Sequence, residues 1–138
     1  MAEQLITGAT VFRKKRGQAE WLVIKADSKT PGELIKGPVR RGESSVGAIL
    51  RILREEQGMS VEVLEESGRI SSSSKTIYYL IEQSAPADKQ RLTHQEKWGQ
   101  YSQIAKTLGS EKERKILSQA KDVLKELIKK KEDKAKRN

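Results

Sequence analysis

The sequence predicts an α/β fold in which helices cover the faces of a mixed β-sheet. Its periodic segments follow the order strand, strand, helix, strand, strand, helix, which is typical of helices packed on a sheet. Its length of 138 residues fits one domain with one core. We therefore expect one domain over residues 1–130, ending in a helix, and a basic, disordered tail at residues 131–138.

Two alternating apolar segments near the N-terminus predict a β-hairpin. The first covers residues 5–13 and the second covers residues 21–25, and the polar stretch RKKRGQAE between them predicts the turn. A short extended segment, ELIK, then leads into a loop that begins at Gly37.

The segment after this loop predicts a helix. Ser44 or Ser45 can cap its first turn by accepting a hydrogen bond from a free amide. Gly58 is suited to the position after the last turn because glycine tolerates a left-handed backbone, so the helix should end near Gln57. The apolar residues at helical spacing are Val46, Ile49, Leu50 and Leu53.

The second half of the chain predicts another hairpin and two further helices. Residues 61–70 and 75–83 are rich in β-branched and aromatic residues, and the four serines between them predict a turn. Alternation places at least one of the adjacent tyrosines, Tyr78 and Tyr79, in the core. A short helix is expected at residues 103–109. A longer helix starts at Glu111, and its apolar stripe is formed by Ile116, Ala120, Leu124, Leu127 and Ile128.

The composition excludes several kinds of protein. The chain has no cysteine, so disulfide frameworks and thiolate zinc sites are excluded. The N-terminal residues lack a signal pattern, and no apolar run approaches the roughly 20 residues that cross a bilayer. We therefore expect a soluble, cytoplasmic protein that does not contact a membrane.

The charge is strongly basic. The formal net charge is +9, and residues 111–138 carry 11 basic and 6 acidic side chains. Such a field favours polyanionic partners such as nucleotides or RNA. A solubilising, solvated tail explains the C-terminal charge equally directly and is the interpretation that we favour over a dedicated RNA-binding arm.

The helix after the Gly37 loop carries carboxylates at a spacing that suits a divalent ion. Positions 52, 55 and 56 are neighbours on a helix, and Mg²⁺ or Mn²⁺ prefers oxygen ligands. Glu55 and Glu56 supply two of them, but position 52 is Ile52. The alternative is an ordinary charged surface, since Arg51 and Glu55 form an i, i+4 pair.

The spacing of the whole segment resembles the Nudix box. That pattern reads Gly, five residues, Glu, seven residues, Arg-Glu, apolar, any, Glu-Glu, any, Gly, apolar. The residues in register are Gly37, Glu43, Arg51, Leu53, Glu55, Glu56, Gly58 and Met59. The departure is Ile52, which stands where the pattern has Glu. Residues 5–128 as a whole resemble the small diadenosine polyphosphate and nucleotide pyrophosphohydrolases of this superfamily.

The resemblance implies a Nudix-type α/β/α sandwich that hydrolyses nucleoside diphosphate-linked compounds, such as dinucleoside polyphosphates, with Mg²⁺ or Mn²⁺. The carbonyl of Gly37 and the carboxylates of Glu55 and Glu56 would bind the metal, and the two glutamates would be the catalytic residues. The basic residues that would contact phosphate are Lys36, Arg40 and Arg51. Glu43 and Gly58 would have structural roles in the loop and at the helix end.

A second departure lies farther along the chain. The diadenosine polyphosphate branch often has Ser-His-Glu-His where this chain reads Thr93-His94-Gln95-Glu96, so Gln95 replaces an acid. Glu96 could substitute, but on an extended segment it points to the opposite side from Gln95. Loss of a catalytic base lowers a rate by typically a hundredfold or more. We therefore expect either a Nudix hydrolase with weakened activity or a non-catalytic Nudix-fold module that binds a nucleotide, RNA or a protein.

Overall fold

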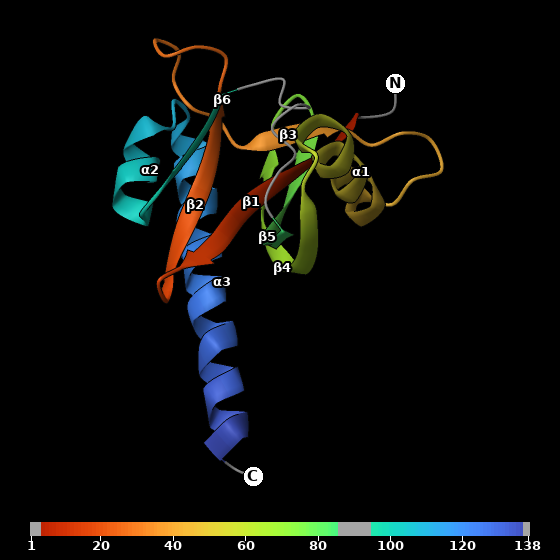
Figure 1. Ribbon diagram of the computed structural model, residues 1–138. Helices are drawn as coiled ribbons and strands as arrows, with labels where there is room; N and C mark the ends of the chain where they lie inside the picture. Colours follow the sequence, from red (N-terminus) through yellow and green to blue (C-terminus); the bar gives the residue numbers. More distant parts are fainter. Residues whose placement is uncertain (1–3, 86–94, 137–138) are drawn as a thin grey trace.

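The computed structural model describes residues 4–85 and 95–136, which form one mixed sheet with helices packed on it (Figure 1). The predicted α/β class is confirmed. The elements in chain order are β1 (Leu5–Lys15), β2 (Gln18–Lys25), β3 (Ile35–Pro38), α1 (Ser45–Gln57), β4 (Ser60–Ser71), β5 (Lys75–Ala85), β6 (Gln95–Gly99), α2 (Tyr101–Thr107) and α3 (Glu111–Lys136).

Strand β1 is the centre of the sheet. The strand order is β4-β5-β1-β2-β6, and β3 also pairs with β1. Strands β1 and β5 are parallel, whereas the other pairs are antiparallel. Thr7 pairs with Gly37 on one side and with Ile77 on the other, so the loop after β3 starts beside the middle of the sheet.

The first hairpin is present, but its turn is shorter than the sequence predicted. The strands continue to Lys15 and resume at Gln18, which leaves Arg16 and Gly17 as the turn. Both turn residues have positive φ, 54° and 79°, the conformation that matches the twist of a two-residue hairpin. The polar residues that suggested a long turn belong to the ends of the two strands, where Lys14, Lys15 and Gln18 are exposed and Arg13 and Glu20 are half-buried.

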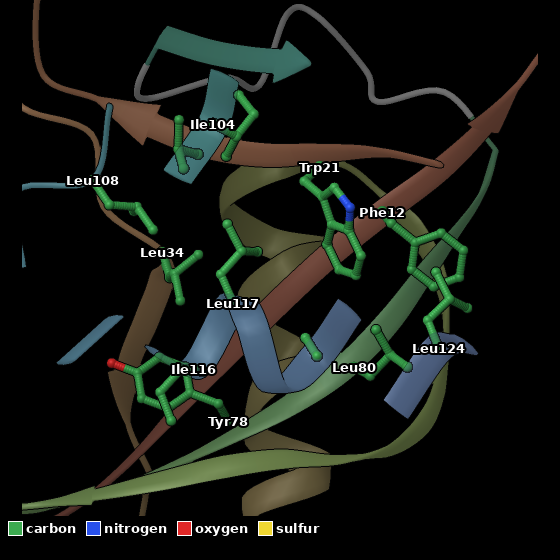
Figure 2. Packing of buried hydrophobic residues seen from close by; sticks show 12 residues of the cluster. Phe12, Trp21, Leu34, Tyr78, Leu80, Ile104, Leu108, Ile116, Leu117 and Leu124 are labelled. Carbon is green, nitrogen blue, oxygen red and sulfur yellow. The ribbon is translucent and has the colours of Figure 1, made fainter. Parts of the chain in front are cut away.

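Two apolar clusters lie on opposite faces of the sheet. Alternation along β1 and β2 directs neighbouring residues to opposite faces, so Val11 and Phe12 belong to different clusters. Figure 2 shows the cluster on the α2 and α3 side, where Tyr78 is buried as alternation predicted. The cluster on the α1 side consists of Ala9, Val11, Leu22, Ile24, Ile35, Ile49, Ile52, Leu53, Met59 and Ile81.

Both predicted ends of α1 are confirmed. The hydroxyl of Ser44 accepts a hydrogen bond from the Gly47 amide at 2.9 Å, which satisfies one free N–H of the first turn. Gly58 has a left-handed backbone with φ 59°, and its amide donates to the Arg54 carbonyl. These local signals fix where α1 begins and ends.

Helix α3 continues to Lys136, so residues 131–136 are helical where the sequence predicted a disordered tail. Lysine, glutamate and alanine are strong helix formers, and the packed turns before them remove the cost of helix nucleation. The domain boundary at residue 130 remains a prediction. Within the described ranges, no helix combines the length and the apolar character needed to cross a bilayer.

Candidate functional site

An ion pair clamps the loop that joins β3 to α1. The guanidinium of Arg51 donates to Glu43 from Nε to Oε2 at 2.8 Å and from Nη2 to Oε1 at 3.1 Å. Its Nη2 also donates to the Pro38 carbonyl at 3.2 Å, and Glu43 accepts from the Arg40 amide at 2.9 Å. One side chain from α1 thus holds both ends of the loop.

The ion pair between Arg51 and Glu43 favours the charged form of both side chains. The hydrogen bond from Arg51 lowers the pKa of Glu43 to about 2, and the Arg40 amide adds to the effect. The same contact raises the pKa of Arg51. Arg51 therefore has a structural role here in addition to the predicted phosphate contact. The side chain of Arg40 is exposed and forms no ion pair with another described residue.

Ile52 fills the space beside Gly37. Its side chain is only 2% exposed and belongs to the apolar cluster under α1. A Cβ atom added to Gly37 would stand 2.8 Å from Cδ1 of Ile52. The position where the Nudix pattern expects a metal-binding carboxylate is therefore packed with hydrocarbon against the glycine whose carbonyl would share the ion.

The side chains of Glu55 and Glu56 in α1 lie outside the contact between Ile52 and Gly37. The side chain of Glu55 is 52% exposed, and its Oε2 lies 3.8 Å from Nη1 of Arg51. Glu56 is also exposed. Nowhere in residues 4–85 and 95–136 do three metal-binding side chains come together. These donors do not form a complete site for Mg²⁺ or Mn²⁺, which favours near-octahedral oxygen coordination.

Lys36 lies on the opposite face of the sheet from the Ile52 contact. Its Nζ is 3.1 Å from Oε2 of Glu113 in α3, and it donates to the Leu34 carbonyl at 3.1 Å. Because side chains alternate along β3, Lys36 points toward α3 while the residues on either side face α1. The structure therefore does not bring Lys36 together with Glu55 and Glu56.

No sequence signal predicted the buried carboxylate that binds Lys36. Glu113 is 5% exposed, and it accepts hydrogen bonds from the Tyr78 hydroxyl at 2.8 Å and the Leu34 amide at 3.2 Å. Burial, followed by the negative charge of Glu113, raises the pKa of Tyr78 well above its usual value. Tyr78 therefore remains a hydrogen-bond donor. Glu113 resembles a solvated first-turn acid in the sequence, and only the tertiary contact reveals its role.

In β6, Glu96 rather than Gln95 faces the α1 side of the sheet. Gln95 pairs with Lys25 and is exposed, whereas Glu96 pairs with Ile24 of the α1-side cluster. The Trp98 indole donates to Oε1 of Glu96 at 3.2 Å, and burial raises the pKa of this carboxyl. Thr93 and His94 of the same motif lie outside the described residues.

Comparison with known proteins finds solved structures that share the fold of this chain. No protein-family model matches the chain, and no curated protein matches it. An Ap4A hydrolase from C. elegans has a TM-score of 0.73 at 18% identity, covering 89% of this chain and 99% of that chain. A NUDIX family hydrolase from Clostridium perfringens has a TM-score of 0.71 at 13% identity, covering 90% and 99%. The NUDIX domain of Shewanella oneidensis NrtR, complexed with ADP ribose, has a TM-score of 0.65 at 15% identity, covering 90% of each chain.

Proposed function

We propose that this chain, whose fold is that of the Nudix hydrolases, binds a nucleoside diphosphate-linked compound and hydrolyses it with weakened activity. The substrate class is a dinucleoside polyphosphate or a nucleoside triphosphate. Support for this class comes from the Nudix box spacing and from the nearly complete overlap with an Ap4A hydrolase. The observation that carries the weakened activity is the burial of Ile52 against Gly37.

The residues of this chain have distinct tasks in such a reaction. Arg51 and Glu43 hold the loop in a fixed shape, so that a ligand meets a preorganised surface. Arg40 and Arg41 are exposed at that loop and can contact phosphate oxygens as planar donors. Bound at Gly37, Glu55 and Glu56, a divalent ion would supply charge to polarise the phosphate. The donor set for such an ion is incomplete without a carboxylate at position 52.

A non-catalytic role is the second candidate. The specific observation in its favour is again Ile52, since a hydrocarbon side chain neither binds a cation nor accepts a proton. The NUDIX domain of NrtR was crystallised with ADP ribose, which supports nucleotide binding as a use of this fold. The ligand of such a module would be a nucleotide, RNA or a protein.

The experimental test introduces a carboxylate at position 52. Wild type, Ile52→Glu and Ile52→Gln are assayed with diadenosine tetraphosphate, ATP and ADP-ribose in the presence of Mg²⁺ or Mn²⁺. We expect Ile52→Glu to hydrolyse a substrate at least about tenfold faster than wild type, because a positioned base contributes a hundredfold or more in complete sites. Ile52→Gln matches the size of the new side chain without its charge, so it should not gain activity. Circular dichroism checks that both variants fold.

The outcomes separate the two candidates. If the wild type binds a nucleotide and neither it nor Ile52→Glu hydrolyses any substrate, the non-catalytic candidate is supported. Wild-type turnover near an ordinary enzymatic rate of about 10 per second would contradict the weakened activity.

A further inference from the structure

A basic pocket lies between β4, an edge strand of the sheet, and the first turns of α3. Its volume is about 510 Å³, including the space open to solvent. Three of the lining residues are cationic, Arg69, Lys112 and Lys115, and none of them is acidic. The other lining residues are apolar or uncharged polar side chains of the same two elements. All of the charge on the pocket wall is therefore positive.

Close packing of α3 on β4 fixes the walls of this pocket. A Cβ atom added to Gly68 would collide with Oε1 of Gln119 and would stand 2.6 Å from Cδ1 of Ile116, so the glycine allows the helix to approach the strand. Gln119 and Ile116 both line the pocket. The two walls are therefore held beside each other before a ligand enters, which lowers the entropic cost of binding.

Glu66 orients Arg69 without using all of its donors. Nε of Arg69 donates to Oε2 of Glu66 at 3.0 Å, and Nη2 donates to Oε1 at 2.8 Å. These bonds use two of the five N–H groups of the guanidinium. The N–H groups of Nη1 take no part in the pair, so they can contact the oxygens of an anion such as phosphate.

The two lysines of the pocket carry charge that the described acids leave unpaired. Neither Lys112 nor Lys115 forms an ion pair within 4 Å with another residue of the described ranges. Glu111, which precedes them in the chain, lies 3.7 Å from Arg114 instead. Each ammonium group is a point charge with three donors on a flexible stem, so it can adjust to an anion that enters the pocket.

The acids near the pocket leave its net charge positive. Lys112 also lines an adjoining groove that contains Glu33 and Glu113, but both of these carboxylates lie within 4 Å of Lys36. Glu66 is the acid that contacts a cation of the pocket. Counting its charge against the three lining cations gives a net charge of +2.

We propose that this pocket binds a terminal phosphate group, carried either by a small phosphate compound or by the end of an RNA. A terminal phosphate has a charge of about −1.5 to −2 at pH 7, which matches the pocket, whereas each internal phosphate of a strand carries a single charge. The pocket lies on the α3 side of the sheet, whereas Glu55 and Glu56 belong to α1 on the other side. The proposal therefore goes beyond the proposed function and does not depend on it.

Titration of inorganic phosphate into the full chain, followed by NMR of the backbone amides, tests the proposal. Sodium chloride keeps the ionic strength constant, so that general screening does not change during the titration. The amides of Ser71, Lys112 and Lys115 should shift with a dissociation constant of about 1 mM. Shifts confined to residues 39–43 would place phosphate at the Arg40 loop, which would overturn this pocket and leave the proposed function standing.

Two matched double variants separate the pocket from net charge. Lys112→Gln/Lys115→Gln should weaken phosphate binding at least about tenfold, because it removes two of the three lining cations. Lys129→Gln/Lys130→Gln makes the same charge change farther along α3, outside the pocket, and should leave the affinity unchanged. Equal losses in the two variants would assign the binding to net charge and overturn the pocket. The absence of a saturable shift in the wild type up to about 20 mM phosphate would also overturn it.

Two short single-stranded RNAs of the same sequence, with and without a 5′-phosphate, identify the carrier of the phosphate. Tighter binding of the phosphorylated strand, lost in Lys112→Gln/Lys115→Gln, would support the pocket with an RNA end as its ligand. If inorganic phosphate binds and neither strand does, the pocket is supported with a small phosphate compound as its ligand. If both strands bind equally and this binding is lost in the same variant, the pocket contacts internal phosphates and the assignment to a terminal phosphate is wrong.

Discussion

The contact between Ile52 and Gly37 shows how one residue changes the chemistry of a site without disturbing its architecture. The isoleucine packs in the apolar core below α1. A carboxylate buried there without a bound ion would lower the free energy of unfolding. The sequence predicted that position 52 lacks a ligand. Its packing against Gly37 could not be predicted, because it depends on the register between β3 and β1.

The close contact gives a stability prediction at position 37. In Gly37→Ala the new Cβ would stand 2.8 Å from Cδ1 of Ile52, inside normal contact distance. We expect the free energy of unfolding to fall by about 1–2 kcal/mol, since overpacking strain exceeds the gain from a stiffer unfolded chain. Urea unfolding measures this change.

The matched control is Ile52→Val, which removes Cδ1. In that background Gly37→Ala should cost about 1 kcal/mol less than in the wild type, because contacting residues couple by such amounts. If the effects of the two substitutions on the free energy of unfolding are additive, the strain does not come from the contact between Gly37 and Ile52.

Gln57 gives a second prediction at the scale of a residue. It is fully buried, and neither its amide nitrogen nor its amide oxygen has a hydrogen-bond partner among the described residues. Gln57→Met keeps the length of the side chain and removes the unpaired groups, so it should stabilise the protein by about 1–3 kcal/mol. A loss of stability, measured by urea unfolding, would show instead that the amide has partners.

At the scale of an element, the β3–α1 loop depends on the ion pair between Glu43 and Arg51. The pKa of Glu43 is lowered from 4.5 to about 2, so its contribution to stability is fully present above pH 4.5 and is lost as the pH falls toward 2. In Glu43→Gln, the free energy of unfolding should fall less steeply across this window. If the free energy of unfolding falls equally steeply with pH in the wild type and in Glu43→Gln, the pKa of Glu43 is not lowered.

The elements differ in how well the sequence predicted them, for physical reasons. Both ends of α1 were predicted because Ser44 and Gly58 act within one turn of the chain. The short length of the turn at Arg16 and Gly17 was not predicted, because arginine at positive φ is uncommon and gives no signal. The face on which Lys36 lies follows from strand alternation, but its partner Glu113 is 77 residues away.

At the scale of the whole molecule, the layers followed from the order of the segments, and the solved Nudix structures share the resulting fold. The candidate site was less predictable. The segment that resembles the Nudix box predicted a common site for Lys36 and the two glutamates of α1, but in the structure Lys36 lies on the other side of the sheet from α1. Alternation along β3 predicts that Lys36 and Gly37 face opposite sides of the sheet, but which of the two sides is covered by α1 depends on tertiary packing.

The most direct test of the central claim is a calorimetric titration of Mn²⁺ into the wild type and into Ile52→Glu. If hydrocarbon at position 52 leaves the donor set incomplete, the wild type should bind the ion weakly, at about millimolar concentration, and Ile52→Glu should bind it at least about tenfold more tightly. Ile52→Gln should behave like the wild type. Micromolar Mn²⁺ binding by the wild type, unchanged in Ile52→Glu, would contradict the claim.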